Sequence, residues 1–329
     1  MQTKVLQGFI DIGGQPGRYA EALRLCGIPA VSWIYQKTLS TTIPDKMLDF
    51  SRSGIWSGRL RKADYLLQIL RNFDILHIHK GFSLFHHAKD LKIAQLLGLK
   101  VFIHYRGSEI RAAMDAVELS PKVREKVLRE ASIAQKILVK DGQLAELLKT
   151  IGVETTVFPN IVDVRAVLPL PQKEIPGEKL RIVHIPTNTA AKGTLDIRKA
   201  IAELGEIVHY EEIQDIPHPL VLEKFQRADL VIDQLRTGTY GNTSLEAMAL
   251  GTPVVNYLNP IFTAYEPEIP PIIPADKGNL SQVIEHLHRN RAELHHAAVN
   301  GKRFVEKFHS FEKVGPQLAK LYGLNPAQS

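Results

Sequence analysis

The chain has 329 residues, which corresponds to roughly two domains of about 150 residues each. Hydrophobic residues make up 44% and charged residues 23%, and this balance excludes wholesale disorder and a coiled coil. The single cysteine, Cys26, excludes an internal disulfide and a cysteine zinc site. No apolar run reaches the roughly 18 residues of a membrane span, and the first residues are too polar for a secretory signal. We therefore expect a cytoplasmic protein.

Positive charge is concentrated in the first half of the chain. Residues 1–165 hold 24 of the 41 Lys and Arg but only 16 of the 35 Asp and Glu. Such a half is either an ordinary solvated face or the binding surface for an anionic partner. Five cations and one tryptophan lie in or near an amphipathic stretch at 63–73, namely Arg52, Trp56, Arg59, Arg61, Lys62 and Arg71. This stretch is either a surface that contacts the inner face of an anionic membrane or a helix whose apolar face is buried. No aromatic stacking platform is present, so we expect no nucleic-acid partner.

Short apolar runs alternate with helical patterns through the first half. The expected strands are 4–10, 30–35, 73–79, 100–107 and 155–163. The expected helices are 17–27, 63–73, 86–99, 121–136 and 141–150. This alternation is typical of a parallel sheet with helices on both faces.

The same alternation restarts after a proline-rich stretch, which we interpret as a linker at 169–179. The expected strands are 180–185, 206–213, 229–235 and 252–258, and the expected helices are 194–204, 218–228, 244–251, 279–290, 291–308 and 311–323. The sequence thus predicts an α/β protein with Rossmann-like parallel-sheet domains at 1–168 and 180–308, facing a central cleft. Ligands of such sheets bind beyond the carboxyl ends of the strands and between domains.

Two segments carry residues suited to binding an anion. Gly13, Gly14 and Gly17 follow the first strand, where backbone N–H groups can approach an anion or a sugar, although glycine turns are also common without a ligand. Lys192 precedes a helix and can neutralise a diphosphate, or it is an exposed lysine near a helix end.

A third segment, 228–255, reads as a strand, a glycine loop, a helix and another strand. The N–H groups of 242–244 open that helix and could hold a phosphate. Glu246, one turn further on, could accept hydrogen bonds from ribose, or it is a glutamate favoured by the helix dipole.

The segment 228–255 resembles the nucleotide-sugar signature of the retaining GT-B glycosyltransferases of family 4, E-G-F-G-x-x-x-x-E-A-M-A-x-G-x-P-V-V. It stands here as GTYG at 238–241, EAMA at 246–249 and GTPVV at 251–255. HIPTNTAAKGT resembles the family's diphosphate loop, 73–111 resembles its D-I-x-H-x-H and H-G-S-D-x-R segments, and FPNIVD resembles its P-N-G-V-D. The resemblance spans nearly the whole chain.

The resemblance implies an N-terminal acceptor domain, which the last helix within 309–329 rejoins, and a C-terminal domain for a nucleotide sugar, most simply a UDP-sugar. It implies transfer with retention to a glycan, lipid-linked glycan or protein acceptor, with no cofactor and no metal. The catalytic residues would be Arg106, His79 and Lys192. The donor-binding residues would be Asn188, Lys192, Gly193, Tyr240, Gly241, Asn242, Thr243, Ser244 and Glu246. The acceptor-binding residues would be Gly13, Gly14, Arg18, His104 and Glu109.

Two departures from the family pattern support an alternative. Gly238 stands where the family has the first glutamate of its E-x(7)-E pair, and Arg106 stands where the family has histidine. The chain could therefore be a catalytically silent relative that binds a glycan or a partner transferase. An epimerase on the same fold is a third possibility. His77 and His79 share one face of a strand and could ligate a metal, but such residues more often belong to a core or a cleft.

Overall fold

The computed structural model describes residues 2–36, 43–50, 55–111, 118–164 and 179–326. The chain forms two compact units, one of residues 1–161 and 311–329 and the other of residues 162–310. Most of the expected linker at 169–179 lies outside the described residues.

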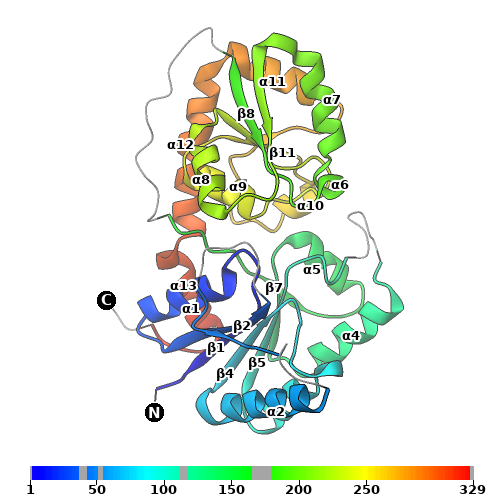
Figure 1. Ribbon diagram of the computed structural model, residues 1–329, viewed down its shortest axis with the longest axis vertical. Helices are drawn as coiled ribbons and strands as arrows, with labels where there is room; N and C mark the ends of the chain where they lie inside the picture. The colour runs from blue at the N-terminus through cyan, green and yellow to red at the C-terminus, as the bar shows by residue number, and fades with distance from the viewer. Residues whose placement is uncertain (1, 37–42, 51–54, 112–117, 165–178, 327–329) are drawn as a thin grey trace. The chain divides into compact units, whose positions relative to one another are not determined.

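The first unit is built on a parallel sheet of seven strands in the order β3-β2-β1-β4-β5-β6-β7 (Figure 1). The strands are β1 (Val5–Ile10), β2 (Ala30–Gln36), β3 (Lys46–Met47), β4 (Ile75–His79), β5 (Lys100–Tyr105), β6 (Lys136–Val139) and β7 (Thr155–Val157). The helices are α1 (Gln15–Leu25), α2 (Ile55–Asn72), η1 (His86–Ala88), α3 (Lys89–Leu96), α4 (Pro121–Ala131), α5 (Gly142–Lys149) and α13 (Phe311–Leu321).

Each face of this sheet has its own hydrophobic core. Side chains of α1 and α13 cover one face, and those of α2, α3, α4 and α5 cover the other. Helices α1 and α13 lie side by side because Gly315 brings them together: a Cβ at this position would lie 2.7 Å from the carbonyl oxygen of Ala22 (Figure 1). Chain segments 290 residues apart thus share one core, and the last helix belongs to the first unit.

The second unit has a parallel sheet of five strands in the order β12-β11-β10-β8-β9. The strands are β8 (Leu180–His184), β9 (Val208–Glu212), β10 (Leu230–Ile232), β11 (Val254–Asn256) and β12 (Ile273–Pro274). The helices are α6 (Thr189–Lys192), α7 (Thr194–Leu204), η2 (Gly205–Ile207), α8 (His218–Arg227), α9 (Asn242–Ala249), α10 (Pro260–Thr263), α11 (Leu280–Arg289) and α12 (Arg291–Phe308).

The prediction of two parallel-sheet α/β domains is confirmed. Several elements of two to four residues were absent from the sequence prediction, namely β3, β12, α6 and α10, because such short elements carry no measurable periodicity. The helix expected at 86–99 is divided, since His87 and Ala88 both have positive φ and separate η1 from α3. No helix among the described residues is both long and apolar enough to cross a membrane.

Candidate functional site

The glycine loop after β1 is a tight turn that leads into α1. Gly13 and Gly14 both have positive φ, and the backbone N–H of Gly14 donates to Asp11 Oδ1 at 2.7 Å. Gln15 and Arg18 of α1 both donate to the carbonyl oxygen of Ile161, at 2.9 and 3.0 Å. Arg18 is buried, so its guanidinium holds the segment that follows β7 against α1.

Arg106 follows β5 and is surrounded by polar and aromatic side chains. Its Nη2 donates to His79 Nδ1 at 2.8 Å, its Nη1 donates to Asn160 Oδ1, and its guanidinium carbon lies 5.3 Å from the centre of the Tyr19 ring. The Glu109 carboxylate accepts from the backbone N–H groups of Arg106 and Gly107. Glu109 therefore closes the turn that carries Arg106, which is buried.

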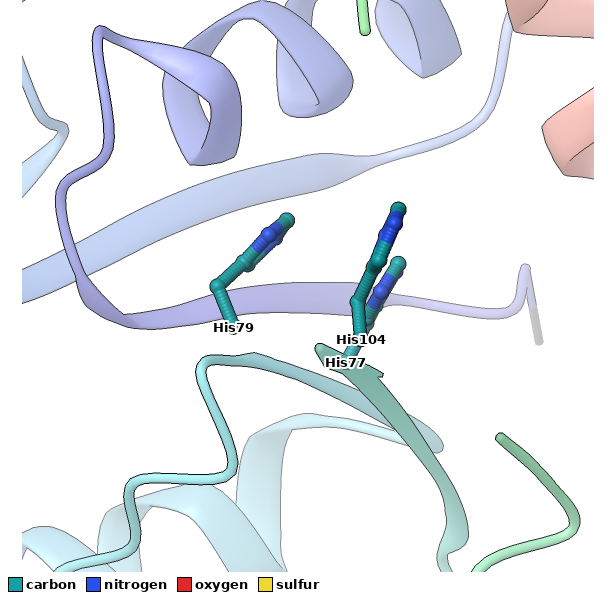
Figure 2. A group of neighbouring side chains, drawn as sticks. All are labelled: His77, His79 and His104. Atoms are coloured by element: carbon teal, nitrogen blue, oxygen red, sulfur yellow. The ribbon is translucent and has the colours of Figure 1, made fainter. Parts of the chain in front are cut away.

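Three histidine rings lie side by side beneath Arg106. His77 and His79 of β4 project from the same face of the sheet, and His104 of β5 pairs in register with His79 (Figure 2). All three are completely buried. Burial first, and then the charge of Arg106, holds the pKa of each ring well below its usual value, so the rings are neutral. His104 has no exposed surface, so an acceptor could contact it only after its neighbours move.

This histidine cluster is the one group among the described residues whose ring nitrogens are close enough to suggest a metal. The nitrogens lie within 4.8 Å of one another, whereas the ligands of a zinc ion with bonds of about 2.0 Å are about 3.3 Å apart. The rings are stacked with interplanar angles of 9–23°, so their in-plane lone pairs run alongside one another (Figure 2). The Arg106 cation also occupies His79 Nδ1. The geometry therefore fits a stack of three neutral rings better than a metal site.

In the second unit, Lys192 meets the start of α9 at one buried carboxylate. The Lys192 side chain is 18% exposed and its ammonium pairs with Asp233 Oδ1, while the Ser244 hydroxyl donates to Asp233 Oδ2 at 2.5 Å. Asp233 is 1% exposed. Burial alone would raise the pKa of Asp233, but Lys192 and Ser244 more than offset it and hold that pKa below the usual value. The carboxylate therefore stays charged.

The loop before α9 is braced by its own polar groups. The Gln234 side chain accepts from the N–H groups of Arg236 and Thr237 and donates to the Thr239 carbonyl oxygen. The Tyr240 hydroxyl donates to Glu266 at 2.8 Å, and the Tyr240 ring is buried. Tyr240 thus anchors the loop from inside.

The first residues of α9 are less enclosed than this loop. Gly241 precedes α9 with an extended backbone, and a Cβ there would meet nothing within 4 Å among the described residues. Asn242 and Thr243 are half-buried. There is therefore room for a ligand to approach the N–H groups that open this helix.

The remaining residues predicted for donor binding lie at helix ends of the same unit. Asn188 is exposed and caps α6 by accepting from the N–H of Ala191 at 2.9 Å. Gly193 has a φ of 73°, which ends α6 and starts α7 directly after Lys192. Glu246 Oε2 lies 3.0 Å from His218 Nε2, at the start of α8. The structure therefore brings Lys192, Ser244 and the start of α9 together through Asp233, and pairs Glu246 with His218.

Gly238, which stands where the family that the sequence resembles has a glutamate, must be glycine for steric reasons. Its φ is +68°, and a Cβ would lie 2.6 Å from Asn259 Cβ. We expect Gly238→Ala to lower the free energy of unfolding by about 1–3 kcal/mol, because the substitution combines backbone strain with overpacking. Urea unfolding checks this. Gly241→Ala is the matched control and should cost less than about 0.5 kcal/mol. Equal losses in the two variants would contradict the steric explanation.

Sequence reasoning missed several residues that the structure places in these sites. In the first unit they are Gln7, Tyr19, Asn160 and Tyr322, and in the second they are His218, Asp233 and Gln234. Most lie far along the chain from the residue that they contact, so no local spacing reveals them. The signal for Asp233 was its place at the end of a buried strand, where a charged residue needs a partner.

No protein-family model matches the chain, and no curated protein matches its sequence significantly. Among solved structures, it is similar to a sucrose-phosphate synthase from Thermosynechococcus elongatus, with a TM-score of 0.69, 15% identity and 98% of each chain covered. It is similar to Anabaena HepE, solved with UDP and glucose, with a TM-score of 0.68 and 14% identity over 98% of this chain and 100% of HepE. It is also similar to the lipopolysaccharide outer core galactosyltransferase WaaB, with a TM-score of 0.58 and 15% identity over 98% and 99% of the two chains.

These similarities cover almost the whole length of this chain and of each protein that it matches. They also agree with the two parallel sheets that the structure contains. The chain therefore has the fold of the GT-B glycosyltransferases.

Proposed function

We propose that the chain is a glycosyltransferase that uses a nucleotide-sugar donor, most simply a UDP-sugar. The observation that carries the proposal is the meeting of Lys192 and the start of α9 at Asp233. A lysine and the N–H groups of a helix start are the two features that bind a diphosphate, and here they come from segments about 50 residues apart. HepE, which has the same fold, was solved with UDP and with UDP-glucose.

In this proposal, the second unit stabilises the leaving nucleotide. When the glycosidic bond of the donor breaks, negative charge develops on the diphosphate, and the Lys192 ammonium and the amides at 242–244 would balance it. Glu246 would accept hydrogen bonds from ribose hydroxyls. We further propose transfer with retention and without a metal, since these groups themselves supply positive charge.

The first unit would hold the acceptor near Arg106. Arg106 is fixed on three sides by His79, Asn160 and Tyr19, so its guanidinium can bind or orient an electron-rich acceptor group at the end of β5. Gly13 and Gly14 would contact the acceptor. Arg18, His104 and Glu109 would support the acceptor site without touching the acceptor, because Arg18 and Glu109 are hydrogen-bonded to backbone groups and His104 is completely buried.

We also propose that the acceptor lies at or near an anionic membrane surface. Leu60 and Leu67 lie two turns apart on α2 and are 72% and 49% exposed. Arg59 and Arg71 are exposed on the same helix. Exposed leucines flanked by cations are suited to the boundary between headgroups and acyl chains. The side chain of Trp56 and residue Arg52 lie outside the described residues.

Nucleotide binding tests the proposed function. UDP, UDP-glucose, GDP and ADP are titrated calorimetrically into the wild type, Glu246→Ala and Glu246→Gln. We expect one nucleotide class to bind, and Glu246→Ala to weaken it about 10- to 100-fold, which corresponds to about 1–3 kcal/mol for lost ribose hydrogen bonds. Glu223→Ala is the control, since Glu223 lies on the surface of α8 and pairs only with Arg227 among the described residues.

A silent relative that binds a glycan or a partner remains the second candidate, and Gly238 favours it. The space around Gly238 excludes a carboxylate there, so the donor contact that the related family makes at this position is absent. Failure of every nucleotide to bind the wild type would overturn the transferase proposal in favour of this one.

A further inference from the structure

A continuous row of hydrogen bonds connects the C-terminal end of α13 with Arg106. Tyr322, the residue after α13, contacts two strands: its hydroxyl oxygen lies 2.5 Å from His77 Nδ1 and 2.8 Å from Gln7 Nε2. Gln7 Oε1 in turn lies 3.1 Å from His79 Nε2, and His79 Nδ1 lies 2.8 Å from Arg106 Nη2. The row therefore runs through β1 and β4 beneath the proposed acceptor site.

The direction of every bond in this row is determined by its chemistry. A guanidinium can only donate, so His79 Nδ1 accepts from Arg106 and the proton of His79 is on Nε2. His79 Nε2–H then donates to Gln7 Oε1, and the Gln7 amide nitrogen donates to the Tyr322 hydroxyl oxygen. The single hydroxyl proton of Tyr322 is left for His77 Nδ1. Every bond within the row thus joins a donor to an acceptor, which puts the proton on Nε2 in both His77 and His79; His77 Nε2 itself has no hydrogen-bond partner among the described residues.

The row is rigid because its side chains are buried and two of them lie on paired positions of neighbouring strands. Gln7 pairs with His77 across β1 and β4, and Gln7, His77 and His79 have no exposed surface. The Tyr322 ring packs 4.7 Å from Phe102 and meets His77 edge-on at 5.9 Å. Its hydroxyl is thus held in place by packing, and burial raises the pKa of that hydroxyl well above its usual value.

We infer that Tyr322 is a positioning residue that acts on Arg106 through Gln7 and His79. By accepting from Gln7, Tyr322 turns the Gln7 carbonyl toward His79, which keeps the proton of His79 on Nε2 and leaves Nδ1 free to accept from Arg106. Without that hydroxyl, Gln7 can turn over and His79 can carry its proton on Nδ1, where it would oppose Arg106. The inference rests on the proposed function only for the consequence in catalysis.

NMR of the full chain tests the row of hydrogen bonds without any substrate. In the wild type at pH 7.5, we expect ¹⁵N shifts of a neutral ring protonated on Nε2 for His77 and His79, and a slowly exchanging Nη2–H for Arg106. Tyr322→Phe keeps the ring and removes only the hydroxyl. It should bring the Nδ1–H form of His79 to a measurable population and abolish the protection of Arg106. Phe102→Leu is the matched control, because it loosens the same contact without removing a hydrogen bond. Unchanged His79 and Arg106 signals in Tyr322→Phe would overturn the inference.

A kinetic measurement tests the consequence for function. The rate of UDP release from UDP-glucose, with water as the acceptor, is compared in the wild type, Tyr322→Phe and Phe102→Leu. We expect kcat of Tyr322→Phe to fall about 3- to 10-fold, the worth of one hydrogen bond, with KM for UDP-glucose unchanged and Phe102→Leu near the wild type. An equal fall in both variants would indicate a merely structural role and overturn the inference. If the wild type neither binds nor cleaves UDP-glucose, UDP-glucose is excluded as the donor, and NMR alone decides the role of Tyr322.

Discussion

Acidification from pH 7.5 to pH 5.5 is expected to lower the free energy of unfolding by about 4 kcal/mol through the three buried histidines alone. In the unfolded chain, each histidine takes up a proton near pH 6.5, which is the ordinary value. In the folded chain, His77, His79 and His104 have pKa values well below this, because they are buried and face the charge of Arg106. Each ring that stays neutral at pH 5.5 contributes about 1.4 kcal/mol to the loss.

The sign follows from which state binds more protons. Above about pH 7.5, these rings are almost entirely neutral in both states, so the free energy of unfolding hardly depends on them. As the pH falls through 6.5, only the unfolded state gains protons, so unfolding becomes easier until the pH reaches the lowered values of the folded state. The other titratable groups facing the cluster, Tyr19 and Tyr322, stay uncharged because burial raises the pKa of both hydroxyls. Asp90 and Glu130, whose pKa values burial raises, oppose the trend at lower pH, so the comparison stops at pH 5.5.

Urea unfolding at pH 5.5, 6.5 and 7.5 measures this dependence. His104→Phe should reduce it by about 1.4 kcal/mol between pH 7.5 and pH 5.5, since it removes one of the three rings. Neither nitrogen of His104 has a hydrogen-bond partner among the described residues. His295→Gln on the exposed surface of α12 is the control and should leave the dependence unchanged. A wild-type stability that does not change between pH 7.5 and 5.5 would show that the cluster can be protonated in place.

The local motifs of the candidate site were predictable from the sequence, whereas the partners of its residues were not. The sequence predicted Lys192 before a helix and a helix start near 242–244, because both depend on neighbouring residues. Asp233, which joins them, lies 41 residues from Lys192 in the chain. Its role depends on β10 lying next to β8 in the sheet, and strand order cannot be derived from periodicity.

In the first unit, too, the partners of the site residues could not be predicted from the sequence. His77 and His79 were expected to share a face, and they do, because side chains alternate along a strand. Their partner Tyr322 is 245 residues from His77 and reaches it only because α13 packs beside α1. The sequence left both a core and a cleft open for His77 and His79, and the structure buries both completely in the core. Polar partners from distant segments make this burial tolerable. Composition and spacing carry no information about such a network.

Lys192→Met is expected to reduce turnover of a UDP-sugar by about 10²- to 10³-fold, as the loss of one group that stabilises developing charge does in other enzymes. The same substitution leaves the Asp233 carboxylate buried without its cation, which should lower the free energy of unfolding by about 3–5 kcal/mol. Turnover and the midpoint of urea unfolding are measured on the same preparations at pH 7.5.

The double variant Lys192→Met/Asp233→Asn separates these two effects. An amide at 233 is neutral and can still accept from the Ser244 hydroxyl, so the unpaired buried charge disappears and most of the lost stability should return. Turnover should stay low, because both variants lack the Lys192 ammonium that we propose for the diphosphate. Recovery of turnover together with stability would mean that Lys192 serves only to neutralise Asp233. If stability alone recovers, Lys192 acts on the donor, and Asp233 holds the ammonium in place until a diphosphate competes for it.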